Sequence, residues 1–415
     1  MELFDILAVV ITLTAGFSFI NHRFIGLPVT IGVMLIALVA SLILQVVDLF
    51  GFHLGDLAEA WLRTIDFNKT LLHGLLSFLL FAGALHVNLN DLLDQKWMIG
   101  LLATVGTIMS TFFVGTFTWW VFQMLGIPLS YLMCLVFGAL ISPTDPIAVL
   151  GILKNAKAPK SLEVKITGES LFNDGVGVVI FLVLAELASG AHELSLGRVA
   201  GLFAQEALGG VMFGLTVGYA AYRLLKSIDH YQVEVMITLA LVMGGYALAN
   251  ALHLSGPIAI VVAGLLIGNQ GRVLAMSDKT REHLDLFWEL IDEILNAVLF
   301  VLIGLEVLVL QFTQEYLVAS LLLIPLILGA RLLAIGLPFS LLKRGRTYTP
   351  GAVWLMTWGG LRGGISVALA LSLPPGPDRH IILAITYVVV VFSIVVQGLT
   401  VEKLVKRMMI PKSVS

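Results

Sequence analysis

Apolar runs of about 20 residues recur along the whole chain and constrain its fold more than any other feature. A helix needs roughly 20 consecutive apolar residues to cross the hydrocarbon core of a bilayer. Of the 415 residues, 59% are hydrophobic and only 12% are charged, and the mean hydropathy is +1.00, so too few polar side chains are available to cover a soluble protein. The sequence therefore predicts an all-α polytopic membrane protein with about thirteen helices, at roughly 3–20, 26–47, 70–89, 98–125, 129–153, 164–189, 199–225, 232–252, 256–270, 284–311, 316–342, 350–373 and 380–405.

The loops between these runs carry a charge bias that predicts the orientation. Cytoplasmic loops of membrane proteins are enriched in Lys and Arg. With the N-terminus outside, 18 of the 24 Lys and Arg residues fall in inner loops or in the C-terminal tail, and four fall in outer loops. The remaining two, Arg331 and Arg362, lie inside apolar runs. We therefore expect a multi-pass protein of the cell (inner or plasma) membrane with a cytoplasmic C-terminus.

Several classes of function are excluded by composition. The formal net charge of -3, without a basic tail, argues against a nucleic-acid partner. Cys134 is the single cysteine, so an intrachain disulfide is excluded and a cysteine metal site is not expected. The sequence has no Gly-x-x-x-x-Gly-Lys loop for ATP, which argues against primary pumping. We expect neither an enzyme nor a bound cofactor.

Acidic and hydroxyl side chains interrupt the sixth run. Ser170 and Asp174 are four residues apart and share a helix face, whereas Glu169 lies on a different face. A carboxylate at membrane depth is costly and usually has a function. The alternatives are a structural ion pair or a soluble core helix, and the hydrophobicity of the surrounding runs favours the functional reading.

Two prolines interrupt the fifth run. Pro143 and Pro146 bracket Thr144 and Asp145, and proline both removes an N–H and clashes with the preceding turn. We therefore expect a helix that breaks within the membrane and leaves free backbone carbonyls beside a carboxylate. Such a set of oxygens suits a small cation.

Glycines interrupt the twelfth run, where four of them surround Arg362 between positions 359 and 364. Glycine in membrane helices often serves only close packing. However, two interrupted helices seven runs apart would have opposite orientations in the membrane, which is typical of inverted-repeat transporters.

Three motifs in this order resemble the signatures of monovalent cation:proton antiporters of the NhaP/NHE type: SPTDP at 142–146, GESLFNDG at 168–175 and GGLRG at 359–363. The resemblance implies an NhaA-like inverted-repeat fold in which the fifth and twelfth helices are discontinuous and crossed. It implies a scaffold and dimerisation domain of residues 1–97 and 191–315, and a core transport domain of residues 98–190 and 316–415. It further implies a homodimer that exchanges Na⁺, with Li⁺ or K⁺ as further candidates, for H⁺ by an elevator-like movement of the core.

The same resemblance, taken with the residue chemistry, assigns the cation ligands. Asp174 is expected to be alternately protonated and bound to Na⁺. Asp145 would supply a second carboxylate, Ser170 a hydroxyl, and Thr144 a backbone carbonyl. If Asp145 stays ionised, the protonated and the Na⁺-bound forms of Asp174 carry equal charge, so exchange should be electroneutral and one for one.

Four polar residues near the ligands are expected to be structural. The Asn173 amide should tie the two helices together, and the resemblance pairs Glu169 with Arg362. It also points Arg331 toward the partially negative C-terminal ends of the broken helices.

Two positions depart from the family pattern, because Ala82 and Asn296 stand where relatives often carry an acid. An acidic cluster at Asp285, Glu289, Asp292 and Glu293 would either line a cytoplasmic funnel or form a solvated helix start. Two other functions compete with the antiporter interpretation. A cation channel is the first alternative, and a receptor or structural membrane protein is the second. Competition between H⁺ and a cation at Asp174 favours an antiporter over a multi-ion channel. K⁺/H⁺ exchange is the alternative within the family.

Overall fold

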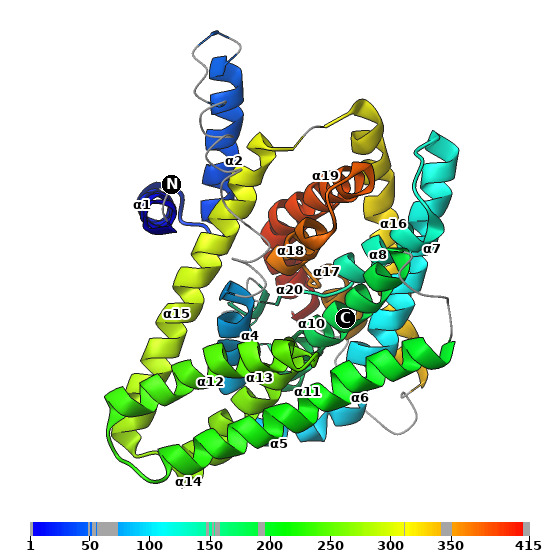
Figure 1. Cartoon of the computed structure of the whole chain (residues 1–415). Coiled ribbons are helices and arrows are strands. Elements are labelled where there is room, and N and C mark those ends of the chain that lie inside the picture. The colour runs from blue at the N-terminus through cyan, green and yellow to red at the C-terminus, as the bar shows by residue number, and fades with distance from the viewer. Residues whose placement is uncertain are drawn as a thin grey trace, which may run out of the picture.

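The computed structural model describes residues 3–48, 50–51, 55, 74–146, 149–151, 153, 158–189, 196–310, 312–341 and 351–409. In this part of the chain every regular element is helical, and the only bridge between extended residues is an isolated one (Figure 1). The elements are α1 (Leu3–Ile20), η1 (Asn21–Ile25), α2 (Val29–Asp48), α4 (Leu76–Leu85), α5 (Leu89–Asp94), α6 (Lys96–Leu101), η3 (Leu102–Gly106), α7 (Thr107–Leu125), α8 (Tyr131–Ile141), α10 (Lys160–Ala188), α11 (Leu196–Leu225), α12 (Tyr231–Ala251), α13 (Gly256–Leu266), η4 (Ile267–Gly271), α14 (Arg272–Leu274), α15 (Asp278–Leu305), η5 (Glu306–Leu308), α16 (Gln314–Leu341), α17 (Ala352–Trp358), α18 (Gly364–Ser372), α19 (Pro377–Phe392), η6 (Ser393–Gln397) and α20 (Gly398–Met409).

Helix lies within each of the thirteen predicted apolar runs. Among the described residues, nine helices are long and apolar enough to cross a membrane. Two shorter apolar helices, Leu76–Leu85 and Tyr131–Ile141, lie in the third and fifth runs. The prediction of an all-helical membrane protein is confirmed.

Short polar residues set several helix starts. Ser130, Ser255 and Ser277 each accept a hydrogen bond from a backbone N–H in the first turn of α8, α13 and α15, respectively. This satisfies one of the donors that a helix start leaves without a partner. At the C-terminal end of α7, Gly126 adopts the left-handed conformation, which is open to glycine without steric cost.

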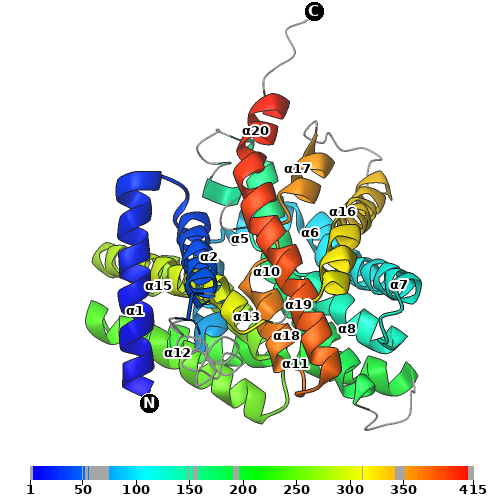
Figure 2. The same cartoon turned by 90° about the horizontal axis from the view of Figure 1, so that it is seen from above.

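The helices pack in two sets. α7, α8, α10, α16, α18 and α19 contact one another, and α2, α4, α11, α12, α13 and α15 form the other set, with α1 against α15. Figures 1 and 2 show α1 at the edge opposite α7. Within each set some helices approach closely at glycine, because a Cβ on Gly138 would lie 2.3 Å from the Thr111 carbonyl and one on Gly268 would lie 2.1 Å from the Leu85 carbonyl.

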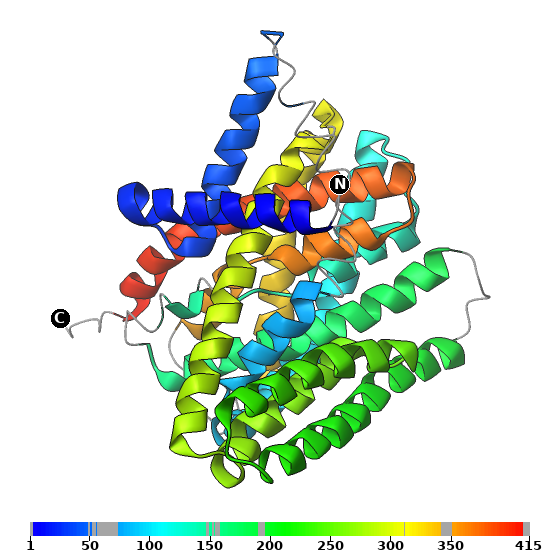
Figure 3. The same cartoon turned by 60° about the vertical axis from the view of Figure 1, so that its left-hand side comes forward.

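Two interruptions of helix lie inside the first of these sets. α8 ends at Ile141 and helix is next described at Val149, while α17 ends at Trp358 and α18 begins at Gly364. The predicted breaks at the proline and glycine motifs are therefore present. Figure 3 shows α18 beside α19, which precedes the C-terminal helix α20.

Candidate ion site at two helix breaks

The two breaks meet through their backbones. The N–H of Asp145 donates to the carbonyl of Leu361 at 2.8 Å, and these two residues form the isolated bridge. A Cβ at Gly363 would lie 2.5 Å from Oδ2 of Asp145, so only glycine lets the second break approach so closely. Gly363 is also the N-cap of α18, so the Asp145 carboxylate lies beside the start of that helix.

Arg362 is buried at this junction and bonds to the first break. Its Nη1 donates to the carbonyl oxygens of Ser142 at 2.5 Å and of Pro143 at 2.9 Å, and its backbone N–H donates to Ser393 Oγ at 2.9 Å. The two carbonyls follow the C-terminal end of α8, where a helix is partially negative. The guanidinium therefore satisfies acceptors that the broken helix leaves free.

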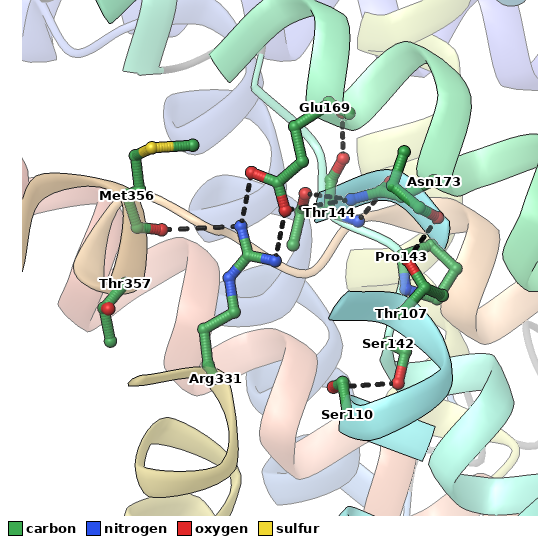
Figure 4. Close-up of polar contacts among 12 residues, drawn as sticks. Thr107, Ser110, Ser142, Pro143, Thr144, Glu169, Asn173, Arg331, Met356 and Thr357 are labelled. Carbon is green, nitrogen blue, oxygen red and sulfur yellow. Dashed lines mark hydrogen bonds and ion pairs between the residues drawn. The ribbon is translucent and has the colours of Figure 1, made fainter. Parts of the chain in front are cut away.

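Glu169 is paired with Arg331. Nη1 and Nη2 of Arg331 donate to Oε1 and Oε2 of Glu169 at 2.5 and 2.9 Å, in a bidentate pair (Figure 4). Glu169 is 2% exposed and Arg331 is 6% exposed, so both charges are removed from water. The expected pair of Glu169 with Arg362 is wrong, because the side chain of Arg362 bonds to the carbonyls of the first break.

The role expected of Arg331, facing the negative ends of broken helices, largely belongs to Arg362. Arg331 keeps one long contact of this kind, from Nη2 to the carbonyl of Met356 in α17 at 3.5 Å. A Cβ at Gly360 would lie 2.7 Å from Nε of Arg331, so the second break passes directly over this guanidinium.

Asn173 connects α10 to the first break. Its Nδ2 donates to Oγ1 of Thr144 at 2.9 Å, and its Oδ1 accepts from the N–H of Thr144 at 3.3 Å (Figure 4). The same Nδ2 lies 3.4 Å from Oε1 of Glu169. One turn away, the Ser170 hydroxyl donates to the carbonyl oxygen of Thr144. Asn173 and Ser170 thus hold both the side chain and the backbone of Thr144 in place.

Asp174 lines a cavity of about 710 Å³. Thr144, Asp145 and Ser170 line the same cavity, so the structure gathers all four expected ligands around one space. Asp174 is 9% exposed, whereas His86, Lys160 and Glu289 at other points of the lining are exposed. The cavity therefore connects the buried carboxylate with the surface.

Part of the acidic cluster on α15 contributes to this cavity. Glu289 and Asp292 line it, Asp285 instead bonds to Arg272, and Glu293 is exposed outside the lining. Where the mouth is exposed, Lys160 at the start of α10 forms an ion pair with Asp91 of α5 at 2.6 Å. Ala82 and Asn296, the positions that depart from the family pattern, also line the cavity.

Comparison with known proteins identifies the family. The model for the transmembrane sodium/hydrogen exchanger matches residues 9–407. This chain belongs to the sodium/hydrogen exchanger family. The resemblance inferred from three motifs is confirmed.

Two bacterial relatives match this exchanger over most of their length. It is 52% identical to the Na(+)/H(+) antiporter NhaP of Pseudomonas aeruginosa over 408 residues, which cover 97% of this chain and 96% of the relative. It is 35% identical to the Na(+)/H(+) antiporter NhaH of Halobacillus dabanensis over 358 residues, covering 82% and 84%. The structure of the sodium proton antiporter MjNhaP1 from Methanocaldococcus jannaschii at pH 8 matches with a TM-score of 0.78 at 18% identity, covering 98% of this chain and 99% of that one. The exchanger is thus a multi-pass membrane protein with the NhaP antiporter fold.

Sequence reasoning missed two polar residues that support the second break of this exchanger. Ser393 accepts the backbone N–H of Arg362, and Nε2 of Gln397 donates to the carbonyl of Trp358 at 2.8 Å. Both residues lie in η6, a π-helical turn between α19 and α20. Their signal was available, because they are buried polar side chains within an apolar run, and π-helical turns are frequent at functional sites.

Proposed function

We propose that this chain is a secondary antiporter that exchanges Na⁺ for H⁺ at Asp174. The observation that carries the proposal is a buried carboxylate that lines the same cavity as the Thr144 and Asp145 residues of a helix break and the Ser170 hydroxyl. Hard oxygen ligands of this kind suit alkali cations. Family membership and the names of the relatives point to the same chemistry. Li⁺ and K⁺ are further candidate substrates.

The proposed architecture has thirteen membrane helices in an inverted repeat, with the fifth and twelfth crossing at their breaks. Residues 98–190 and 316–415 would form the moving core, and residues 1–97 and 191–315 the scaffold and homodimer contact. With the N-terminus outside and the C-terminus cytoplasmic, the mouth near Lys160 faces the cytoplasm. The ion cavity in this conformation would then be open to the cytoplasmic side of the plasma membrane.

The proposed ligands are four oxygens. Asp174 and Asp145 would supply carboxylates, Ser170 its hydroxyl and Thr144 its backbone carbonyl. The Ser170 hydroxyl donates to the Thr144 carbonyl. Binding would exchange that hydrogen bond for two contacts between oxygen and the cation. Asn173 would hold Thr144 in place during this exchange, because its contacts to Thr144 leave the carbonyl free.

The charges around the site support one-for-one exchange. Glu169 and Arg331 neutralise each other. The Asp145 carboxylate lies beside the start of α18, where the positive helix end favours a negative charge, and Arg362 lies at the same junction. The variable charge then belongs to Asp174 alone, which carries either one proton or one cation.

The first test is Asp174→Asn in proteoliposomes. The amide is nearly isosteric with the protonated acid but releases no proton, so cation-driven proton flux should fall to the level of empty vesicles at normal expression. Asp292→Asn is the matched control, since it makes the same change in the same cavity and should keep flux within about threefold, as expected of a group that only attracts cations. Flux retained by Asp174→Asn would refute the assignment of the exchanging carboxylate.

The second test concerns competition and stoichiometry. Because a cation must displace a proton, the apparent KM for Na⁺ should rise about tenfold per unit of falling pH once the site is mostly protonated. A membrane potential imposed with valinomycin and a K⁺ gradient should leave the Na⁺/H⁺ rate unchanged. A rate that follows the potential would exclude one-for-one exchange, and proton flux elicited better by K⁺ or Li⁺ than by Na⁺ would revise the substrate.

A further inference from the structure

A second cavity opens on the helix set that holds the breaks, and none of its lining residues lines the cavity of the ion site. It has a volume of about 600 Å³ and lies between α16, α17 and α20. Figure 2 shows these three helices next to one another. Its walls are mainly apolar, with Pro325 and Leu328 from α16, Trp354 and Trp358 from α17, and Leu404 and Met408 from α20. We name it the α16–α20 groove.

Two cations line this groove. Lys403 and Arg407 both line it and are four residues apart, so they share a face of α20. Among the described residues, neither forms an ion pair, whereas Lys406 on the same helix pairs with Glu402 at 2.5 Å. Opposite that face, Val401 and Val405 are fully buried and hold α20 against the protein. The two charges are therefore fixed on a rigid helix at the edge of an apolar space.

The exposed aromatic residue Trp354 fits a position of the groove at a membrane surface. Trp354 is 58% exposed, and Trp side chains are enriched where hydrocarbon meets water. Nε1 of the neighbouring Trp358 donates to Oγ1 of Thr400 at 2.9 Å, which satisfies its polar group and leaves the ring for apolar contacts. Water would be poorly accommodated between such walls, whereas an acyl chain would fit.

We propose that the α16–α20 groove binds one anionic phospholipid. The phosphate would contact Lys403 and Arg407, and one acyl chain would lie against α16 near Gly329. A zwitterionic lipid would fit the apolar walls equally well, so Lys403 and Arg407 supply the preference for net negative charge. The groove lacks the residues of the ion site, so this proposal is independent of the ion that the protein transports.

The headgroup contact is tested with the full-length protein by native mass spectrometry after titration with dioleoylphosphatidylglycerol or dioleoylphosphatidylcholine. The protein should retain phosphatidylglycerol in preference. The double variant Lys403→Ala/Arg407→Ala should lose about 30-fold in affinity for it, since each cation near an anionic headgroup contributes roughly a fivefold factor. Lys406→Ala removes one positive charge from the same helix outside the groove and should change the affinity less than twofold, against about fivefold for Lys403→Ala alone. Equal losses in both variants, or equal retention of the two lipids, would overturn the proposal.

The acyl-chain contact is tested by filling the groove. A Cβ on Gly329 would meet no atom within 4 Å, so Gly329→Leu should fold normally and occupy the space of the chain. It should weaken phosphatidylglycerol binding at least tenfold. Gly336→Leu is the control, since this glycine on α16 is equally open but lies outside the groove, and it should bind as the parent does. Unchanged binding by Gly329→Leu would place the lipid elsewhere.

Discussion

Arg331 and Arg362 are both buried in the same helix set, yet the surroundings of the two guanidinium groups differ. Arg331 on α16 makes a bidentate ion pair with Glu169. Arg362 in the second break makes side-chain hydrogen bonds only to backbone carbonyls of Ser142 and Pro143 among the described residues. A carboxylate cancels a full charge, whereas two carbonyls at a helix end offer only partial charges.

This difference separates a structural charge from a charge that belongs to the ion site. The pair of Arg331 and Glu169 is neutral within itself and can be replaced as a unit. The charge of Arg362 is left to act on the surrounding carboxylates, and Asp145 is the acid at the same junction. Replacing Arg362 should therefore affect transport as well as stability.

The largest expected effect comes from splitting the neutral pair. Glu169→Gln or Arg331→Gln alone should destabilise the folded protein by about 3–5 kcal/mol, because each leaves one buried charge without its partner. The double variant Glu169→Gln/Arg331→Gln should recover most of this loss. Thermal melting of the purified protein in detergent measures all three. Additive losses in the double variant would mean that the two side chains are not partners.

An intermediate effect is expected for Arg362→Gln, which should cost about 1–3 kcal/mol through carbonyls left partly unsatisfied in a buried position. Combined with Glu169→Gln, it should not give the recovery of stability expected for Glu169→Gln/Arg331→Gln, since Glu169 and Arg362 form no ion pair and share no hydrogen-bond partner among the described residues. Recovery of stability in this double variant would support the pairing of Glu169 with Arg362 that was first expected from the sequence. Arg362→Gln should also raise the apparent KM for Na⁺ in proteoliposomes, whereas the Glu169→Gln/Arg331→Gln protein should keep it.

The smallest effect is expected for an ion pair of similar chemistry in contact with water. Asp91 and Lys160 pair at the cavity mouth, where the Lys160 side chain is 72% exposed. Asp91→Asn should lower the free energy of unfolding by no more than about 1 kcal/mol, as measured by thermal melting. Raising the salt concentration should abolish this difference from the parent protein. A loss as large as that of Glu169→Gln would show that burial does not set the strength of these pairs.

The sequence predicted the positions of the breaks but not the partners of the arginines. Pro143 and Pro146 cannot continue a helix, and the glycines around Arg362 weaken one, so local chemistry was sufficient for both breaks. The hydrogen bonds of Asn173 to Thr144 could also be anticipated, because the two motifs lie on consecutive helices.

The partner of Glu169 depends on how distant helices are rotated about their axes, and a single sequence does not contain that information. Arg331 and Arg362 are both arginines near the middle of apolar runs, so depth in the membrane does not distinguish them. Their environments differ because α16 presents one guanidinium to α10, whereas the second break brings the other against the end of α8. The pair of Asp91 and Lys160 was missed for a similar reason, since neither residue stands out from ordinary loop charges.

The carbonyl contacts of Arg362 also determine when the site can form during synthesis of the chain. Arg362 follows Ser142 by 220 residues in the chain. At about 5–20 residues per second, a ribosome needs roughly 10–45 s to translate that interval. During this time the nascent fifth helix stands in the membrane with its carbonyls lacking their final donor. The site is therefore completed only when the C-terminal part of the chain is inserted, and truncation after α16 should leave an incomplete site in a chain that is recognised by membrane quality-control proteases.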